Sequence, residues 1–172
     1  MSGGAVAAKL ASLGIVLTKP PVPVANYVPF VKSGNLLHVA GQISKVGDTL
    51  LTGKVGQGGA SVQDAQKAAA ACVVNFLMQL NEATGGHLDA VRRIVKINVF
   101  VNSAPDFTEQ PAVANGASDL LVTVFGDAGR HARSAVGVAQ LPFGVLVEID
   151  GVVDIDETKL HPQHSSMMQF CM

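Results

Sequence analysis

The stretch that decides the fold is GRHARSAVGVAQLPFGVLVEIDGVV, residues 129–153. It holds two alternating segments, each typical of a β-strand, joined by a Pro-Phe-Gly turn. Arg133 lies at the start of the first segment and Glu148 within the second. A guanidinium binds a carboxylate through two parallel hydrogen bonds, and a nearby carboxylate can orient or deprotonate a water. The pair therefore predicts a site for a small acidic metabolite that reacts with water.

The second segment separates its side chains into two faces. One face is apolar, and the other carries Glu148 and Asp150. The apolar side chains are Val145, Val147, Ile149 and Val153. Farther upstream, residues 93–102 alternate in the same way, with Val95, Ile97, Val99 and Val101 predicted to face the core. Two more strands are expected at residues 26–32 and 36–44, around the turn at residues 33–35.

Three helices are predicted. The strongest covers residues 61–84, where Ser61 and Asp64 resemble a capping box and two glycines follow the end. Its buried stripe is Ala65, Ala69, Cys72, Phe76, Leu80 and Ala83. A second helix runs from Pro111 to about Phe125. A short first helix buries Val6, Leu10 and Leu13 and stops at Gly14, ahead of a proline-rich linker.

This order of elements predicts an α+β fold in which two long helices cover one face of a single mixed sheet. The opposite face is expected to carry Ile94, Lys96, Asn98 and Phe100, which is too apolar for plain solvent surface. We therefore expect it to be buried against other subunits. The chain of 172 residues is interpreted as one domain, with a helix and linker at residues 1–24, a core at 25–155 and a tail at 156–172.

Composition narrows the class of protein. Charged residues make up 15% and hydrophobic residues 48%, which also favours oligomerisation. The net charge of −1 argues against nucleic acid and anionic membranes as partners. No apolar run is long enough to span a bilayer, and no secretory signal is evident, so the expected location is the cytoplasm. Cys72 and Cys171 provide no disulfide framework.

Each candidate site residue also has an ordinary structural interpretation. Arg133 could be a surface arginine paired with an acid, and Glu148 an exposed strand residue. Tyr27 could wall a pocket or simply pack half-buried, and Gly41 could approach an anion or mark a bulge. Cys72 fits an inert packed thiol. His161 and His164 are spaced too loosely for a metal site, so no metal is expected.

At these residues the chain resembles the reactive intermediate deaminase family (RidA, YjgF or L-PSP). The resemblance spans roughly residues 27–153. Its strongest part is Ala132-Arg133-Ser134 with the later Leu141-Pro142 and Val147-Glu148-Ile149. The markers Ser33-Gly34-Asn35 and Ala40-Gly41-Gln42-Ile43 also match, as does the 95–101 strand followed by Asp106-Phe107.

The resemblance implies a chorismate-mutase-like fold, a homotrimer with a central barrel, and clefts between subunits. It implies that Arg133 binds the substrate carboxylate and Glu148 positions water. Tyr27 would be the pocket tyrosine, Gly41 a backbone contact, and Asn115 an asparagine ahead of the second helix. Residues 109–114 and the loop before Arg133 are longer here, and the N-terminal helix and tail are extra, which indicates a divergent subfamily.

The expected activity is hydrolysis of reactive enamines and imines, such as 2-aminoacrylate and 2-iminobutanoate, to 2-keto acids and ammonia. Pyridoxal-phosphate enzymes would supply these substrates. No cofactor is expected, because a protonated imine is already electrophilic. One alternative is a non-catalytic, regulatory protein that binds a small carboxylate. Another is an endoribonuclease using His131 as base, which the absence of a basic patch disfavours.

Overall fold

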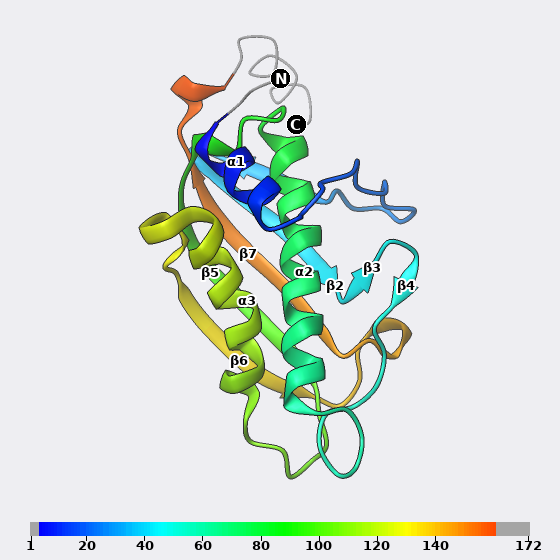
Figure 1. Ribbon diagram of the computed structural model, residues 1–172. Coiled ribbons are helices and arrows are strands. Elements are labelled where there is room, and N and C mark those ends of the chain that lie inside the picture. Colours follow the sequence, from blue (N-terminus) through cyan, green and yellow to red (C-terminus); the bar gives the residue numbers. More distant parts are fainter. Residues whose placement is uncertain (1–3, 161–172) are drawn as a thin grey trace.

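The computed structural model describes residues 4–160 of the chain (Figure 1). Its helices are α1 (Ala5–Ser12), α2 (Val62–Ala83) and α3 (Gln110–Phe125), and its strands are β1 (Phe30–Ser33), β2 (Leu36–Ile43), β3 (Lys45–Val46), β4 (Thr49–Leu50), β5 (Val91–Asn102), β6 (Ala132–Val138) and β7 (Val147–Ile155). Short 3-10 turns lie at η1 (Leu88–Ala90), η2 (Gly126–Gly129), η3 (Pro142–Gly144) and η4 (Glu157–Lys159).

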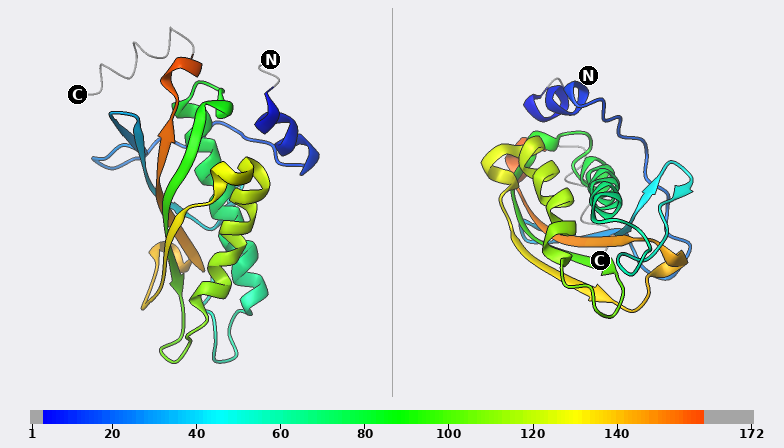
Figure 2. Two further views of the ribbon diagram at one scale, coloured as in Figure 1. Left: turned by 90° about the vertical axis from the view of Figure 1, so that its left-hand side faces the viewer. Right: turned by 60° about the horizontal axis from the view of Figure 1, so that its bottom comes forward.

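The main sheet has the order β1-β2-β7-β5-β6, and β3 and β4 form a separate hairpin. β5 and β6 are parallel, whereas the other neighbours in the main sheet are antiparallel. The helices all lie on one side of this sheet (Figure 2). The predicted α+β fold with a mixed sheet is therefore confirmed.

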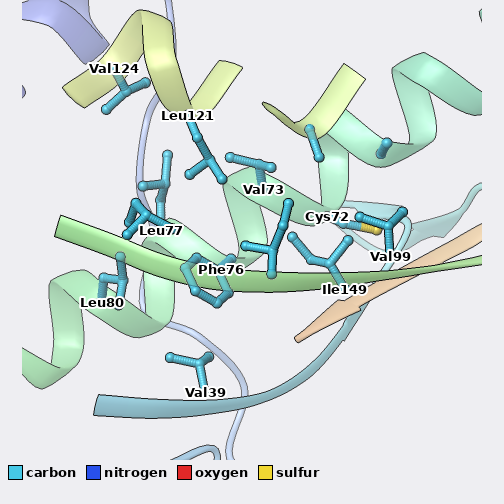
Figure 3. Packing of buried hydrophobic residues seen from close by; sticks show 14 of the residues in the cluster. Val39, Cys72, Val73, Phe76, Leu77, Leu80, Val99, Leu121, Val124 and Ile149 are labelled. Atoms are coloured by element: carbon cyan, nitrogen blue, oxygen red, sulfur yellow. The ribbon is translucent and has the colours of Figure 1, made fainter. Parts of the chain in front are cut away.

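Helix α2 forms where its local signals predict it. The Ser61 hydroxyl accepts a hydrogen bond from the Asp64 N–H at 3.0 Å, and the Asp64 carboxylate accepts one from the Ser61 N–H at 3.2 Å. This capping box satisfies N–H groups that the first helical turn leaves without partners. Every residue of the predicted stripe is buried. Phe76 points from α2 into the core toward the sheet (Figure 3), and Gly151 leaves room for its ring.

The alternation predicted for β5 is wrong at one end. Ile94 is fully buried, whereas Val95 is 37% exposed. The cause is an irregularity between Ile94 and Lys96, which pair with the consecutive residues Val153 and Val152 of β7. The extra residue in β5 reverses the alternation at this end of the strand. Ile94 therefore lies in the core, where Val95 was predicted, and Val95 lies on the opposite face, where Ile94 was predicted.

Other boundaries also differ from prediction. Leu13 follows α1 and is 41% exposed, because the helix ends before it and Gly14 turns the chain with a positive φ. The first strand begins at Phe30 rather than at residue 26, so Tyr27 precedes the sheet. Residues 156–160 of the predicted tail include η4, and the Asp156 N–H donates to the Ala90 carbonyl. Residues 161–172, including His161, His164 and Cys171, lie outside the described part.

Among residues 4–160, no helix covers the face of the sheet away from α2 and α3, which is termed here the open face (Figure 2). Val31 and Val136 lie on it and are 53% and 47% exposed. A groove of about 410 Å³ also lies there, lined by Val28, Phe30, Val31, His38, Val39, Ala40, Asn98, Asp150, Gly151 and Val152. Within residues 4–160, no helix has the length and apolar character needed to cross a membrane.

Candidate functional site

Arg133 lies on β6, the strand at one edge of the main sheet, and its side chain is on the helix face. It pairs with Ile97 of β5, which is fully buried beneath the helices. Its Nη1 donates to Asn115 Oδ1 at 2.9 Å and to Ser118 Oγ at 3.0 Å. Its Nη2 reaches the Pro111 carbonyl at 3.4 Å. The guanidinium is thus held against the first turns of α3.

These contacts use only some of the N–H donors of the Arg133 guanidinium, whose paired donors are termed here the fork. An arginine carries five N–H donors, two on each Nη and one on Nε. Among residues 4–160, the Nε–H and one Nη2–H of Arg133 have no acceptor. The two nitrogens are neighbours on one planar group, and the side chain is partly exposed. The open donors can therefore bind a carboxylate.

Two α3 residues hold this arginine, and the sequence indicated one of them. Asn115, a predicted site residue, contacts Arg133 from within α3 rather than from a position before the helix. Ser118 was missed. Its spacing of three residues from Asn115 places both on the same side of a helix, and this periodicity could have identified it.

A histidine completes the group around Arg133. His131 Nε2 lies 2.9 Å from Ser118 Oγ, and its Nδ1 lies 2.6 Å from the Gly129 carbonyl oxygen. Burial lowers the pKa of His131, and the neighbouring Arg133 charge lowers it further, against the opposing effect of the Gly129 hydrogen bond. His131 is therefore held toward its neutral form.

Glu148 lies on the open face, where it pairs with Phe100 of β5 and Ile43 of β2. Gly41 lies beside it, in the irregular part of β2 between Val39 and Gln42. A Cβ added to Gly41 would overlap Glu148 Oε1. A side chain at position 41 would displace the Glu148 carboxylate from this place. The irregular register agrees with the interpretation of Gly41 as a bulge residue, and its contact with an anionic ligand stays a prediction.

The surroundings of Glu148 favour its protonated form. Burial raises the pKa of its carboxyl, and repulsion from Asp150 raises it further. Asp150 accepts a hydrogen bond of 2.7 Å from Asn98 Nδ2, which holds it in place. A carboxyl whose pKa is raised by burial is a stronger proton acceptor when ionised, which suits acid–base catalysis.

Tyr27 is not part of either group. Its side chain is 59% exposed, and its backbone N–H donates to the Ala25 carbonyl. The next residue, Val28, lines the open-face groove together with Asp150. Tyr27 is thus adjacent in sequence to a residue of the groove, and its role as a pocket residue stays a prediction.

One chain thus brings Arg133 together with Asn115, and Glu148 together with Gly41, but it separates the two groups. Arg133 pairs with Ile97 of β5 and its side chain lies on the helix face, whereas Glu148 pairs with Phe100 of β5 and its side chain lies on the open face. Ile97 and Phe100 are three residues apart along β5. Three residues along a strand correspond to about 10 Å, in addition to the thickness of the sheet. A ligand held by Arg133 therefore does not reach Glu148 of the same chain.

Comparison with known proteins supplies the family context. The family model for Endoribonuclease L-PSP matches residues 17–155. Protein TCP17 of Trypanosoma cruzi is 52% identical over 159 residues, covering 91% of this chain and 98% of that protein. A 2-iminobutanoate/2-iminopropanoate deaminase of Dermatophagoides farinae is 30% identical over 138 residues, covering 79% of this chain and 91% of that protein.

Solved structures agree with this assignment. Atu1372 of Agrobacterium tumefaciens, a protein of unknown function, has a TM-score of 0.82 at 48% identity, covering 88% of this chain and 93% of that one. A structure from Shewanella oneidensis has a TM-score of 0.83 at 26% identity, covering 88% of this chain and all of that one (100%).

Proposed function

Because this chain belongs to the L-PSP endoribonuclease family, also known as RidA or YjgF, we propose that it hydrolyses small 2-imino acids to 2-keto acids and ammonia. The observation that carries the proposal is the Arg133 fork, which is fixed against α3 with two donors open. The Dermatophagoides relative, which is named a 2-iminobutanoate/2-iminopropanoate deaminase, supports the reaction class.

The chemistry assigns one role to each group. Arg133 binds the carboxylate of the substrate, which orients the adjacent C=N bond. Glu148 accepts a proton from a water as the water oxygen adds to the C=N carbon. Glu148 then returns this proton to the nitrogen of the carbinolamine, and the C–N bond breaks to release ammonia. As the C=O bond of the 2-keto acid forms, the hydroxyl O–H bond breaks and its proton passes to Glu148, which releases it to solvent. The raised pKa of Glu148 suits this cycle, since the carboxyl must take up a proton and release it in each turnover.

The two groups act together when they come from two copies of the chain. Within the described part of the chain, no strand pairs with the outer edge of β6, and no helix covers the exposed apolar side chains of the open face. A second copy packed there covers these apolar side chains. It also brings its Glu148 to the Arg133 of the first copy, or its Arg133 to the Glu148 of the first copy. A homotrimer has three such junctions, each carrying one complete site.

Ribonuclease activity fits this chain less well. His131, the candidate base, has both ring nitrogens in hydrogen bonds within the chain. The net charge of −1 provides no general attraction for a phosphate backbone.

The test generates 2-iminobutanoate with a threonine dehydratase and measures 2-oxobutanoate release above the spontaneous rate. Glu148→Gln should lose at least about tenfold in kcat while its affinity for 2-oxobutanoate changes little, because the carboxylate contact remains. Arg133→Lys should lose at least about tenfold in kcat/KM and in that affinity, because lysine lacks the fork.

Matched controls are Glu82→Gln, on the exposed side of α2, and Arg130→Lys, whose side chain pairs with Asp127 at the surface. Both should retain wild-type rates. Hydrolysis by wild type and Glu148→Gln at the same rate would exclude the proposed role of Glu148. Binding of 2-oxobutanoate without any turnover would replace the enzyme with a carboxylate-binding protein.

A further inference from the structure

A continuous hydrogen-bonded chain runs from Arg133 to the backbone of the loop before β6. Arg133 Nη1 lies 3.0 Å from Ser118 Oγ, and Ser118 Oγ lies 2.9 Å from His131 Nε2. His131 Nδ1 lies 2.6 Å from the Gly129 carbonyl oxygen. This series of hydrogen bonds connects α3 to the start of β6, and it includes Arg133, whose remaining N–H donors can bind a ligand.

The positions of the hydrogens on His131 and Ser118 follow from the two ends of this series of hydrogen bonds, the Gly129 carbonyl and the Arg133 guanidinium. Gly129 contributes a carbonyl oxygen, which only accepts, so His131 Nδ1 carries a hydrogen. In a neutral imidazole Nε2 is then unprotonated, and it accepts a hydrogen bond from the Ser118 hydroxyl. The lone pairs of Ser118 Oγ remain free to accept from Arg133 Nη1. Each donor in the chain therefore has one acceptor when His131 is neutral.

We propose that His131 and Ser118 are positioning residues for Arg133, and that neutral His131 fixes the hydroxyl orientation that aims the guanidinium at its carboxylate ligand. The ligand part of this inference rests on the proposed function, whereas the hydrogen-bonded chain does not.

Protonation of His131 should disturb this arrangement. Nε2 would then donate to Ser118 Oγ, the hydroxyl would lose its acceptor, and two cations would flank one oxygen atom. The carboxylate binds at the other edge of the guanidinium, so its attraction to His131 acts over a longer distance than the repulsion between the two cations. We therefore expect carboxylate affinity to fall when His131 gains a proton.

The other charged groups around His131 are already engaged or exposed. Arg130 pairs with Asp127 of η2 at 3.3 Å, and Arg93 of β5 donates to the Arg130 carbonyl at 3.1 Å. On α3 the neighbouring acid, Asp119, is exposed. Arg133 is the charge that acts on the His131 pKa, in the lowering direction.

The first measurement needs no ligand. Protein labelled with 15N-histidine reports which ring nitrogen of His131 carries the proton, and the His131→Gln variant identifies the signal. We expect a protonated Nδ1 and a bare Nε2 at pH 7.5. We also expect the Arg133 Nη1 hydrogens to exchange slowly with solvent, and several-fold faster in Ser118→Ala. A neutral His131 protonated at Nε2, or Arg133 exchange unchanged in Ser118→Ala, overturns the inference.

The second measurement is the affinity for 2-oxobutanoate between pH 7.5 and pH 5. At pH 7.5, Ser118→Ala and His131→Leu should bind about tenfold more weakly than wild type. His131→Gln retains an acceptor for the Ser118 hydroxyl and cannot gain a proton, so it should keep most of the affinity and lose the decline toward acid pH. Thr123→Ala is the control, since that α3 hydroxyl bonds only to the Asp119 carbonyl among the described residues.

The outcomes separate this inference from the proposed function. If Arg133→Ala abolishes binding while Ser118→Ala and His131→Leu keep wild-type affinity, the positioning role is wrong and the carboxylate site stands. If Arg133→Ala binds as well as wild type, or wild type does not bind, the proposed function fails. The proton position on His131 and the Arg133 exchange rates then still decide whether the hydrogen-bonded chain exists.

Discussion

The raised pKa of the Glu148 carboxyl makes the free energy of unfolding depend on pH. Burial and then Asp150 raise its pKa above the ordinary value of 4.5. Between that value and the raised one, the folded chain binds more protons than the unfolded chain. The free energy of unfolding therefore falls as the pH rises through this window, and the cost is fully present at higher pH.

Glu148→Gln cannot ionise, so it should escape that cost. We expect its thermal midpoint to match that of wild type near pH 4 and to exceed it by up to a few degrees at pH 7.5, since the group is only half-buried. Glu82→Gln removes the same charge from an exposed position and should show no such pH-dependent gain. Scanning calorimetry at both pH values checks this. An equal or lower midpoint at pH 7.5 would contradict the assigned environment.

Among the elements, β5 shows how one added residue changes which side chains are buried. Because Ile94 fills the core and Val95 lies on the open face, the two neighbours should respond differently to truncation. Ile94→Ala should lower the free energy of unfolding by about 2–5 kcal/mol, as cavity formation does. Val95→Ala should change it by less than about 1 kcal/mol.

Urea unfolding monitored by circular dichroism provides the measurement for both variants. Equal losses, or a larger loss in Val95→Ala, would mean that β5 keeps regular alternation and that the irregularity opposite Val152 and Val153 is absent.

At the scale of the whole molecule, residues 4–160 leave Val31 and Val136 exposed on the open face and leave the outer edge of β6 without a neighbouring strand. We expect sedimentation to give about three times the 17.7 kDa mass of the chain. Val136→Asp places a charge on this edge strand and should shift the mass toward one chain and abolish imine hydrolysis. Val16→Asp, in the exposed linker, should leave both unchanged. A wild-type monomer at micromolar concentration would exclude a site shared between copies.

The sequence alone determined the features that depend on neighbouring residues. The capping box at Ser61, the buried stripe of α2 and the two faces of β7 come from local hydrogen bonding and from side-chain period, so they could be predicted. The choice of Arg133, Glu148, Gly41 and Asn115 as candidates also needed only residue type, spacing and resemblance.

Only the tertiary structure decided how these residues lie relative to one another. The reversal at Ile94, the fit of Gly41 against Glu148, and the Ser118–His131 contact depend on which strands and helices are adjacent and in what register. The same register places Arg133 and Glu148 on opposite faces of the sheet. A local pattern carries no information about such pairing, because it is set by contacts between segments far apart in the chain.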